Sequence, residues 1–206
     1  MTKRYFLLSF AIAGAAAIAG MYLARTLMQP AVAQLESGTA LPAPAPLTAF
    51  NLMDTQGAVI TPTDLRGHPT LVFFGFTYCP DVCPTTLALL AMVQKELALP
   101  GLKIALISVD PERDTPEQLG KYIASFGGDL IGLTGSPPEI VKAQKSFGVA
   151  SSRVELAGGG YTMDHSATVF VLDSQGRKVA VFTPPLRTEA LLRDLRKLAP
   201  ALGRSL

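Results

Sequence analysis

The sequence predicts an α/β sandwich built around a mixed β-sheet. Two continuous apolar runs, at residues 70–76 and 102–109, have the pattern of strands that are buried on both faces. A stretch with helix-start signals follows each run, so strand and helix alternate through the middle of the chain. The last part of the chain predicts two strands joined by a tight turn and then a closing helix. This order of elements is typical of a layered α/β domain.

The expected elements follow one another from residue 50 onwards. The turn residues DTQG at 54–57 predict a short hairpin over 50–60. The first helix is expected over 85–99, because Pro84 suits the first turn of a helix. The other expected elements are helices at 115–126, 138–147 and 188–198, and strands at 131–133, 167–172 and 178–182.

An apolar N-terminal segment indicates that the domain is exported. Residues 5–24 are long enough to span a bilayer, and Lys3 and Arg4 before them favour a cytoplasmic N-terminus. A signal peptide cleaved after Ala33 is the alternative, because residues 31–33 are small. Both interpretations place the domain in an oxidising compartment, and we expect a single-pass anchor in the inner membrane with the domain in the periplasm. The expected parts are an anchor or signal sequence at 1–28, a stiff Pro/Ala-rich linker at 29–47 and a globular domain at 48–206.

The composition narrows the possible partners and sites. The formal net charge is +2 and no run of Lys or Arg is present, which argues against nucleic-acid binding. Two cysteines and two histidines allow at most one modest metal site or one disulfide. Any site in this domain therefore has to be built from very few side chains.

The cysteines lie in the segment TYCPDVCP, between a predicted buried strand and a predicted helix. Functional sites in open α/β sheets lie at the carboxyl ends of strands, so this location fits a functional loop. Cys79 and Cys83 are four residues apart, so a helical curl of the loop would bring both sulfurs to one ion. The start of a helix also stabilises negative charge, and we expect it to lower a thiol pKa there.

Ligand chemistry favours copper at this cysteine pair. Thiolates prefer Cu(I), zinc or iron–sulfur clusters, but two cysteines complete neither a four-ligand structural zinc site nor a four-cysteine cluster. Cu(I) accepts low coordination, so two thiolates and one imidazole suffice. His165 is the candidate third ligand, because it precedes the strand at 167–172, which would lie beside the strand at 70–76 if the two are neighbours. Asp164 next to it is a candidate for orienting the imidazole ring.

Each of these residues also has an ordinary structural interpretation. A cysteine pair in an exported domain is often a structural disulfide, although a bridge that closes so short a loop removes little chain entropy. A single histidine before a strand is usually a surface or core residue, and we interpret His68 as an exposed turn residue. Residues 110–115 are expected to be a connection in which Asp114 or Thr115 caps the following helix.

Four separated motifs resemble the Sco/SenC family over about residues 47–200. The resemblance implies a thioredoxin-like fold, an N-terminal membrane anchor and a copper site that takes Cu(I) and also Cu(II). It maps the metal ligands onto Cys79, Cys83 and His165, and the aspartate between the cysteines onto Asp81. The motifs are GFTYCPDVCPTT at 75–86, SVDPERDTP at 108–116, GLTG at 132–135 and DHS at 164–166.

The resemblance also implies a role in the assembly of cytochrome c oxidase. The expected function is delivery of copper to the dinuclear copper site of the oxidase, with the copper-binding oxidase subunit and a second periplasmic copper chaperone as partners. We therefore expect a metallochaperone and not an enzyme.

The family is also associated with thiol–disulfide exchange, so Cys79 and Cys83 are a candidate redox-active disulfide. The alternative function is a thiol–disulfide oxidoreductase that keeps the oxidase cysteines reduced. The Cys-x3-Cys spacing differs from the Cys-x-x-Cys of typical thioredoxins, and a thiol-only mechanism gives His165 no required role. A thiol peroxidase is disfavoured, because neither Thr nor Ser lies three positions before Cys79.

Overall fold

The computed structural model of the chain describes residues 14, 16–22 and 33–203. Residues 14 and 16–22 are helical, and most of the predicted anchor lies outside the described residues. In the part of the chain that the structure describes, no helix combines the length and the apolar character needed to cross a membrane. Residues 33–203 form a compact unit of their own.

This unit contains an eight-stranded mixed sheet with the strand order β1-β10-β9-β4-β5-β6-β2-β3. The central strands β4, β5 and β6 are parallel, and the other neighbours pair antiparallel. The strands are β1 (Gly38–Ala45), β2 (Leu52–Asp54), β3 (Val59–Ile60), β4 (Thr70–Gly75), β5 (Lys103–Ser108), β6 (Leu130–Thr134), β9 (Val169–Leu172) and β10 (Lys178–Phe182).

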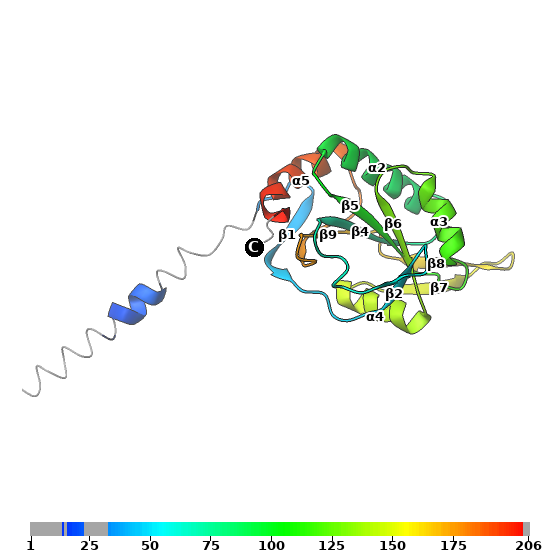
Figure 1. Cartoon of the computed structure of the whole chain (residues 1–206), viewed down its shortest axis with the longest axis horizontal. Coiled ribbons are helices and arrows are strands. Elements are labelled where there is room, and N and C mark those ends of the chain that lie inside the picture. Colours follow the sequence, from blue (N-terminus) through cyan, green and yellow to red (C-terminus); the bar gives the residue numbers. More distant parts are fainter. Residues whose placement is uncertain (1–13, 15, 23–32, 204–206) are drawn as a thin grey trace, which may run out of the picture. The chain divides into compact units, whose positions relative to one another are not determined.

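Helices cover both faces of this sheet. Figure 1 shows α2, α3 and α5 on one side of the sheet and α4 on the other, which gives the layered sandwich that the sequence predicts. The apolar runs explain this arrangement, because every residue of β4 is buried and so are nearly all residues of β5. The helices are α2 (Val82–Leu97), α3 (Pro116–Ala124), α4 (Pro137–Phe147) and α5 (Thr188–Leu202).

The pairing of β9 with β4 determines which loops meet. The two strands run antiparallel, with Phe73 opposite Val169. The end of β4 therefore lies beside the start of β9, so the loop that follows one strand meets the segment that precedes the other. This confirms the expected neighbourhood of the strands that flank the cysteine loop and His165.

Part of the predicted linker is a strand of the sheet instead. β1 is an edge strand that pairs with β10, so residues 38–45 belong to the domain and do not form a free spacer. Its prolines suggested a linker because proline cannot donate to a strand ladder. An edge strand tolerates proline, and Pro42 and Pro44 lie between the paired residues Ala40 and Ala45, where the register shifts.

Two smaller expectations had different outcomes. Thr115 caps α3, since its side chain accepts a hydrogen bond from the Gln118 amide at 3.2 Å. This confirms Thr115 as the cap, and not Asp114, which was the other candidate. His68 is half-buried instead of exposed, because its Nδ1 lies 3.1 Å from the Thr70 hydroxyl at the start of β4. His68 therefore lies at the opposite end of β4 from the cysteine loop.

Asp194 on α5 holds the segment that leads into β1. Its side chain is fully buried and accepts hydrogen bonds from the backbone amides of Glu36 and Ser37, both at 2.7 Å, and from the Ser37 hydroxyl at 2.9 Å. A nearby ion pair between Arg193 and Glu36 lies in a much more exposed position.

We expect Asp194→Ala to lower the free energy of unfolding by about 2–3 kcal/mol, because it leaves two amides without their acceptor. Denaturant unfolding measures the loss, and hydrogen exchange should show faster exchange in β1. Arg193→Ala is the matched control, and removal of its exposed ion pair should cost less than about 1 kcal/mol. Equal losses in both variants would contradict this role for Asp194.

Candidate metal centre

The cysteine loop follows β4 and ends in the first turn of α2. The helix begins at Val82, earlier than expected, so Cys83 is a helical residue while Cys79 lies in the preceding turn. Cys83 is fully buried, Cys79 is partly exposed, and both are free thiols. The Cys83 amide donates a hydrogen bond to Cys79 Sγ at 3.3 Å, which turns the outer sulfur towards the inner one.

His165 comes from a two-stranded hairpin that the sequence did not predict. β7 (Ser151–Glu155) and β8 (Tyr161–His165) pair only with each other, and the Gly-rich stretch lies in the turn between them. His165 is the last residue of β8, and its Nε2 lies 3.4 Å from Cys83 Sγ. The structure thus brings together three side chains that are up to 86 residues apart in the chain, and their ligand atoms lie within 4.8 Å of one another.

The tautomer of His165 leaves the nitrogen that faces the sulfurs free to bind a metal. Its Nδ1 lies 3.1 Å from the Ser166 carbonyl, which can only accept, so Nδ1 carries the proton and Nε2 the lone pair. The rings of Phe73 and Phe76 meet the imidazole edge to face, with centroids 6.0 and 5.7 Å away. An apolar wall therefore lies behind the donor atoms.

Asp164 does not orient the imidazole ring as expected, and Asp81 lies in an exposed position. The Ser166 carbonyl, and not Asp164, is the hydrogen-bond partner of the His165 ring, while Asp164 is exposed. Neighbouring residues of a strand point to opposite faces, which explains why sequence adjacency to His165 did not give a contact. Asp81 is exposed before α2, and its carboxylate accepts a hydrogen bond from the Thr85 hydroxyl at 3.3 Å.

The Cys83 thiol has a higher pKa than expected. Its position at the start of α2 predicted a lowered value, but burial raises the pKa of this thiol well above its usual range. The removal of water from the sulfur outweighs the opposing effect of a hydrogen bond with the Phe76 backbone. Binding of a metal cation at this sulfur would therefore release a proton.

Gly75 leaves the space that the Cys83 sulfur occupies. A Cβ at position 75 would lie 2.9 Å from Cys83 Sγ and 2.9 Å from the Phe73 ring. Its role could have been suspected from a glycine inside an otherwise unbroken apolar strand, which often marks a close approach.

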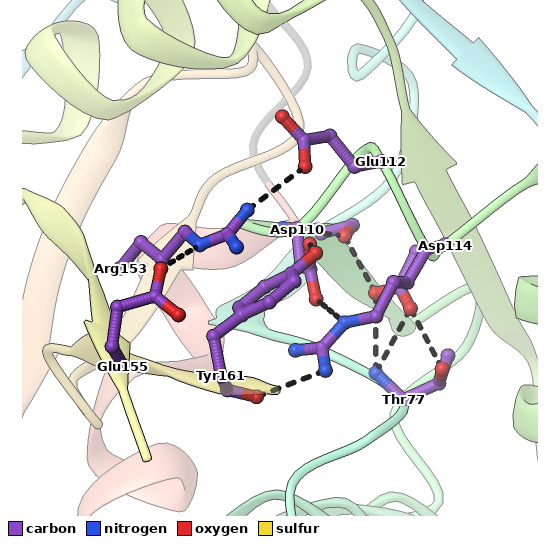
Figure 2. A network of polar contacts seen from close by, with 9 residues as sticks. Thr77, Asp110, Glu112, Asp114, Arg153, Glu155 and Tyr161 are labelled. Carbon is purple, nitrogen blue, oxygen red and sulfur yellow. Dashed lines mark hydrogen bonds and ion pairs between the residues drawn. The ribbon is translucent and has the colours of Figure 1, made fainter. Parts of the chain in front are cut away.

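Asp114 anchors the start of the cysteine loop, a role that the sequence did not reveal. Its buried carboxylate accepts hydrogen bonds from the Thr77 amide at 3.1 Å and the Thr77 hydroxyl at 2.7 Å (Figure 2). It also accepts a hydrogen bond from the Ser108 hydroxyl at 2.6 Å. Burial raises the pKa of this carboxyl, although the hydrogen bonds from Ser108 and Thr77 act in the opposite direction. The side chain holds the loop two residues before Cys79 and does not cap α3.

The fold and the site together define a class. A mixed sheet with helices on both faces, and a dithiol at the end of its central strand, are typical of thioredoxin-like domains. In this chain an imidazole nitrogen also lies beside the two thiols. The class is therefore a thioredoxin-like domain whose two cysteines and one histidine are arranged as a candidate metal site.

Comparisons with known proteins identify the family within this class. The model of the SCO1/SenC family matches residues 39–200, and the chain belongs to this family. The mitochondrial SCO2 homolog of Danio rerio is 39% identical over 132 residues, which are 62% of this chain and 47% of that protein. The match to the bovine SCO2 homolog likewise covers 58% of its length.

Solved structures agree with the fold. ScoI of Bradyrhizobium japonicum with copper bound is 41% identical, with a TM-score of 0.67 over 74% of this chain and 99% of that one. The apo Sco1 protein of Thermus thermophilus is 37% identical, with a TM-score of 0.72 over 82% and 99%. The expected thioredoxin-like fold of the domain is therefore confirmed.

We expect Gly75→Ala to displace the Cys83 sulfur and to lower the free energy of unfolding by about 1–3 kcal/mol, because the site has no room for a methyl group. Denaturant unfolding and the reaction rate of the thiols with a disulfide reagent measure the two effects. Gly158→Ala is the matched control, because a Cβ there meets nothing within 4 Å. An unchanged stability of Gly75→Ala would contradict the close packing.

Asp114 should also give the stability a specific pH dependence. A carboxyl whose pKa is raised by folding holds its proton more tightly in the folded state, so the free energy of unfolding falls as the pH rises through that value. Compared with Asp114→Asn, the natural protein should therefore gain stability as the pH is lowered through the range in which this carboxyl takes up its proton. Denaturant unfolding at several pH values tests this, and parallel curves for the two proteins would exclude it.

Proposed function

We propose that the protein is a copper-binding metallochaperone that holds Cu(I) through Cys79, Cys83 and His165. The observation that carries this proposal is the cluster of two sulfurs and one imidazole nitrogen within 4.8 Å. Membership of the SCO1/SenC family supports it, as do relatives that were solved with copper bound.

The donor set suits Cu(I) better than other biological metals. Thiolates are soft ligands and a neutral imidazole also suits copper, and Cu(I) accepts three such ligands without a fourth. A structural zinc site needs four protein ligands. Among the described residues, the group of side chains that could hold a metal ion has three members, Cys79, Cys83 and His165. Cu(I) is therefore the cargo that this site fits.

The unequal burial of the two cysteines supports delivery instead of permanent storage. Cys83 and the aromatic wall protect one side of the site, whereas Cys79 is partly exposed and its neighbour Tyr78 is 56% exposed. An incoming thiolate of an acceptor protein can approach a bound ion on the Cys79 side. The ion would then pass by exchange of one ligand at a time.

The acceptor that we propose is the dinuclear copper site of cytochrome c oxidase. The family resemblance is the basis of this proposal, and a second copper chaperone in the same compartment is the proposed donor. We further propose that residues 5–24 anchor the protein in the inner membrane, with the domain in the periplasm, because their apolar length and the preceding charges suit a single span.

A thiol–disulfide oxidoreductase is the second candidate function. It is favoured by one observation, the two free thiols with the Cys83 amide donating to Cys79 Sγ, which is suitable for forming and breaking a bridge. The raised pKa of Cys83 makes this sulfur a poor nucleophile without a metal, so Cys79 would have to attack first. His165 has no required part in that reaction.

His165→Ala should lower the Cu(I) affinity by at least about tenfold, which corresponds to about 1.4 kcal/mol, because one of three ligands is lost. Anaerobic competition with a Cu(I) chelator measures the affinity, and X-ray absorption should count two sulfur neighbours and one nitrogen in the unchanged protein. His68→Ala is the matched control, because this imidazole lies at the other end of β4 and should leave both results unchanged.

The same variants separate the two functions. Loss of affinity in His165→Ala with intact disulfide exchange would support the chaperone. Wild-type Cu(I) affinity in His165→Ala would overturn the proposed ligand set and favour the oxidoreductase.

A further inference from the structure

A cluster of charged and aromatic side chains joins the hairpin of His165 to the rest of the domain. We name it the Tyr161 cluster, after its central residue, and its other members are Asp110, Arg113 and Arg153. Figure 2 shows Tyr161 on the hairpin, beside Arg153 and with its hydroxyl directed at the buried carboxylate of Asp110. None of the proposed metal ligands belongs to this cluster.

Arg113 makes three different contacts in this cluster. Its Cζ lies 3.7 Å from the centroid of the Tyr161 ring, and its Nη1 donates a hydrogen bond to the Tyr161 carbonyl at 3.0 Å. Its Nε pairs with Asp110 at 2.5 Å. One guanidinium therefore fixes both the ring and the backbone of Tyr161 relative to the loop after β5.

The remaining contacts complete the attachment of Tyr161. Its hydroxyl donates to the second Asp110 oxygen at 2.9 Å, and Arg153 stacks on its ring with Cζ 3.7 Å from the centroid. Arg153 is itself paired with Glu155 at 2.6 Å and with Glu112 at 3.4 Å. Arg153 is about half exposed, whereas Arg113 is mostly covered, so Arg113 is the inner and better fixed of the two cations.

The position of the hairpin makes this attachment necessary. β7 and β8 form a separate two-stranded sheet, so the pairing of β9 with β4 brings His165 near the cysteine loop but no ladder of the main sheet holds the hairpin itself. Tyr161 and His165 are four residues apart on β8 and share one face of the strand. A shift of Tyr161 would therefore move the imidazole relative to the sulfurs.

Arg113 also contacts the other half of the candidate metal centre. Its Cζ lies 4.8 Å from the centroid of the Tyr78 ring, next to Cys79, and 5.9 Å from that of Phe76. The same guanidinium thus lies against the cysteine loop and against the hairpin of the histidine. Among the described residues, Arg113 is the cationic side chain that stacks on aromatic rings of both the cysteine loop and the hairpin.

We propose that Arg113 is a positioning residue that sets the approach of His165 to the two cysteines, and that it thereby determines whether a bound ion has two ligands or three. This inference rests on the proposed function. Lysine cannot replace arginine here, because only the planar guanidinium stacks on the rings while donating in two directions.

The test measures Cu(I) binding in Arg113→Lys and Arg113→Ala. Both variants should lose at least about tenfold in affinity, and X-ray absorption should show a weakened nitrogen neighbour with both sulfurs retained. Arg177→Ala is the matched control, because Arg177 also pairs with a buried aspartate, Asp173, but at the turn between β9 and β10. It should lose stability in the same way and keep the full copper signature.

A double-mutant cycle with His165→Ala identifies how Arg113 acts. In the His165→Ala background, Arg113→Lys should change the Cu(I) affinity by less than about twofold, because its effect passes through the imidazole. The same loss in both backgrounds would overturn the inference but not the proposed function. Wild-type affinity in His165→Ala alone would overturn the proposed function itself.

Discussion

The antiparallel pairing of β9 with β4 is the constraint on which the rest of the site depends. It places the end of the buried strand that carries the cysteine loop beside the start of the strand that follows His165. Without this pairing, residues separated by 82 positions would have no reason to approach within 3.4 Å. The apolar sequences of both strands enforce it, since both are buried on their two faces.

Around this pairing, hydrogen bonds to buried carboxylates fix the exact positions of the cysteine loop and of the histidine hairpin. Asp114 fixes the start of the cysteine loop through Thr77, and the cluster around Tyr161 fixes the far end of β8. Both attachments begin in the short connection after β5, between Asp110 and Asp114. One turn of the chain therefore controls both the cysteine loop and the histidine hairpin.

The sequence predicted the features that depend on residues close together in the chain. The buried strands, the helices, the Thr115 cap of α3 and the hairpin at 52–60 follow from apolar runs, capping residues and turn residues. The hairpin β7–β8 was missed because four of the five residues of β7 are exposed and show no alternation. Asp114 and Arg113 were missed as anchors because their partners lie 37 and 48 residues away in the chain, and spacing does not reveal such contacts.

The proline-containing strand β1 also protects the sheet. It covers β10, whose KVAVF segment would otherwise present an apolar strand with free hydrogen-bonding groups at the edge. Prolines at 42 and 44 remove two of the amides that β1 could otherwise offer to another chain. A fragment that begins after residue 46 would expose β10 and invite aggregation through strand addition, even though every side chain of the metal centre would still be present.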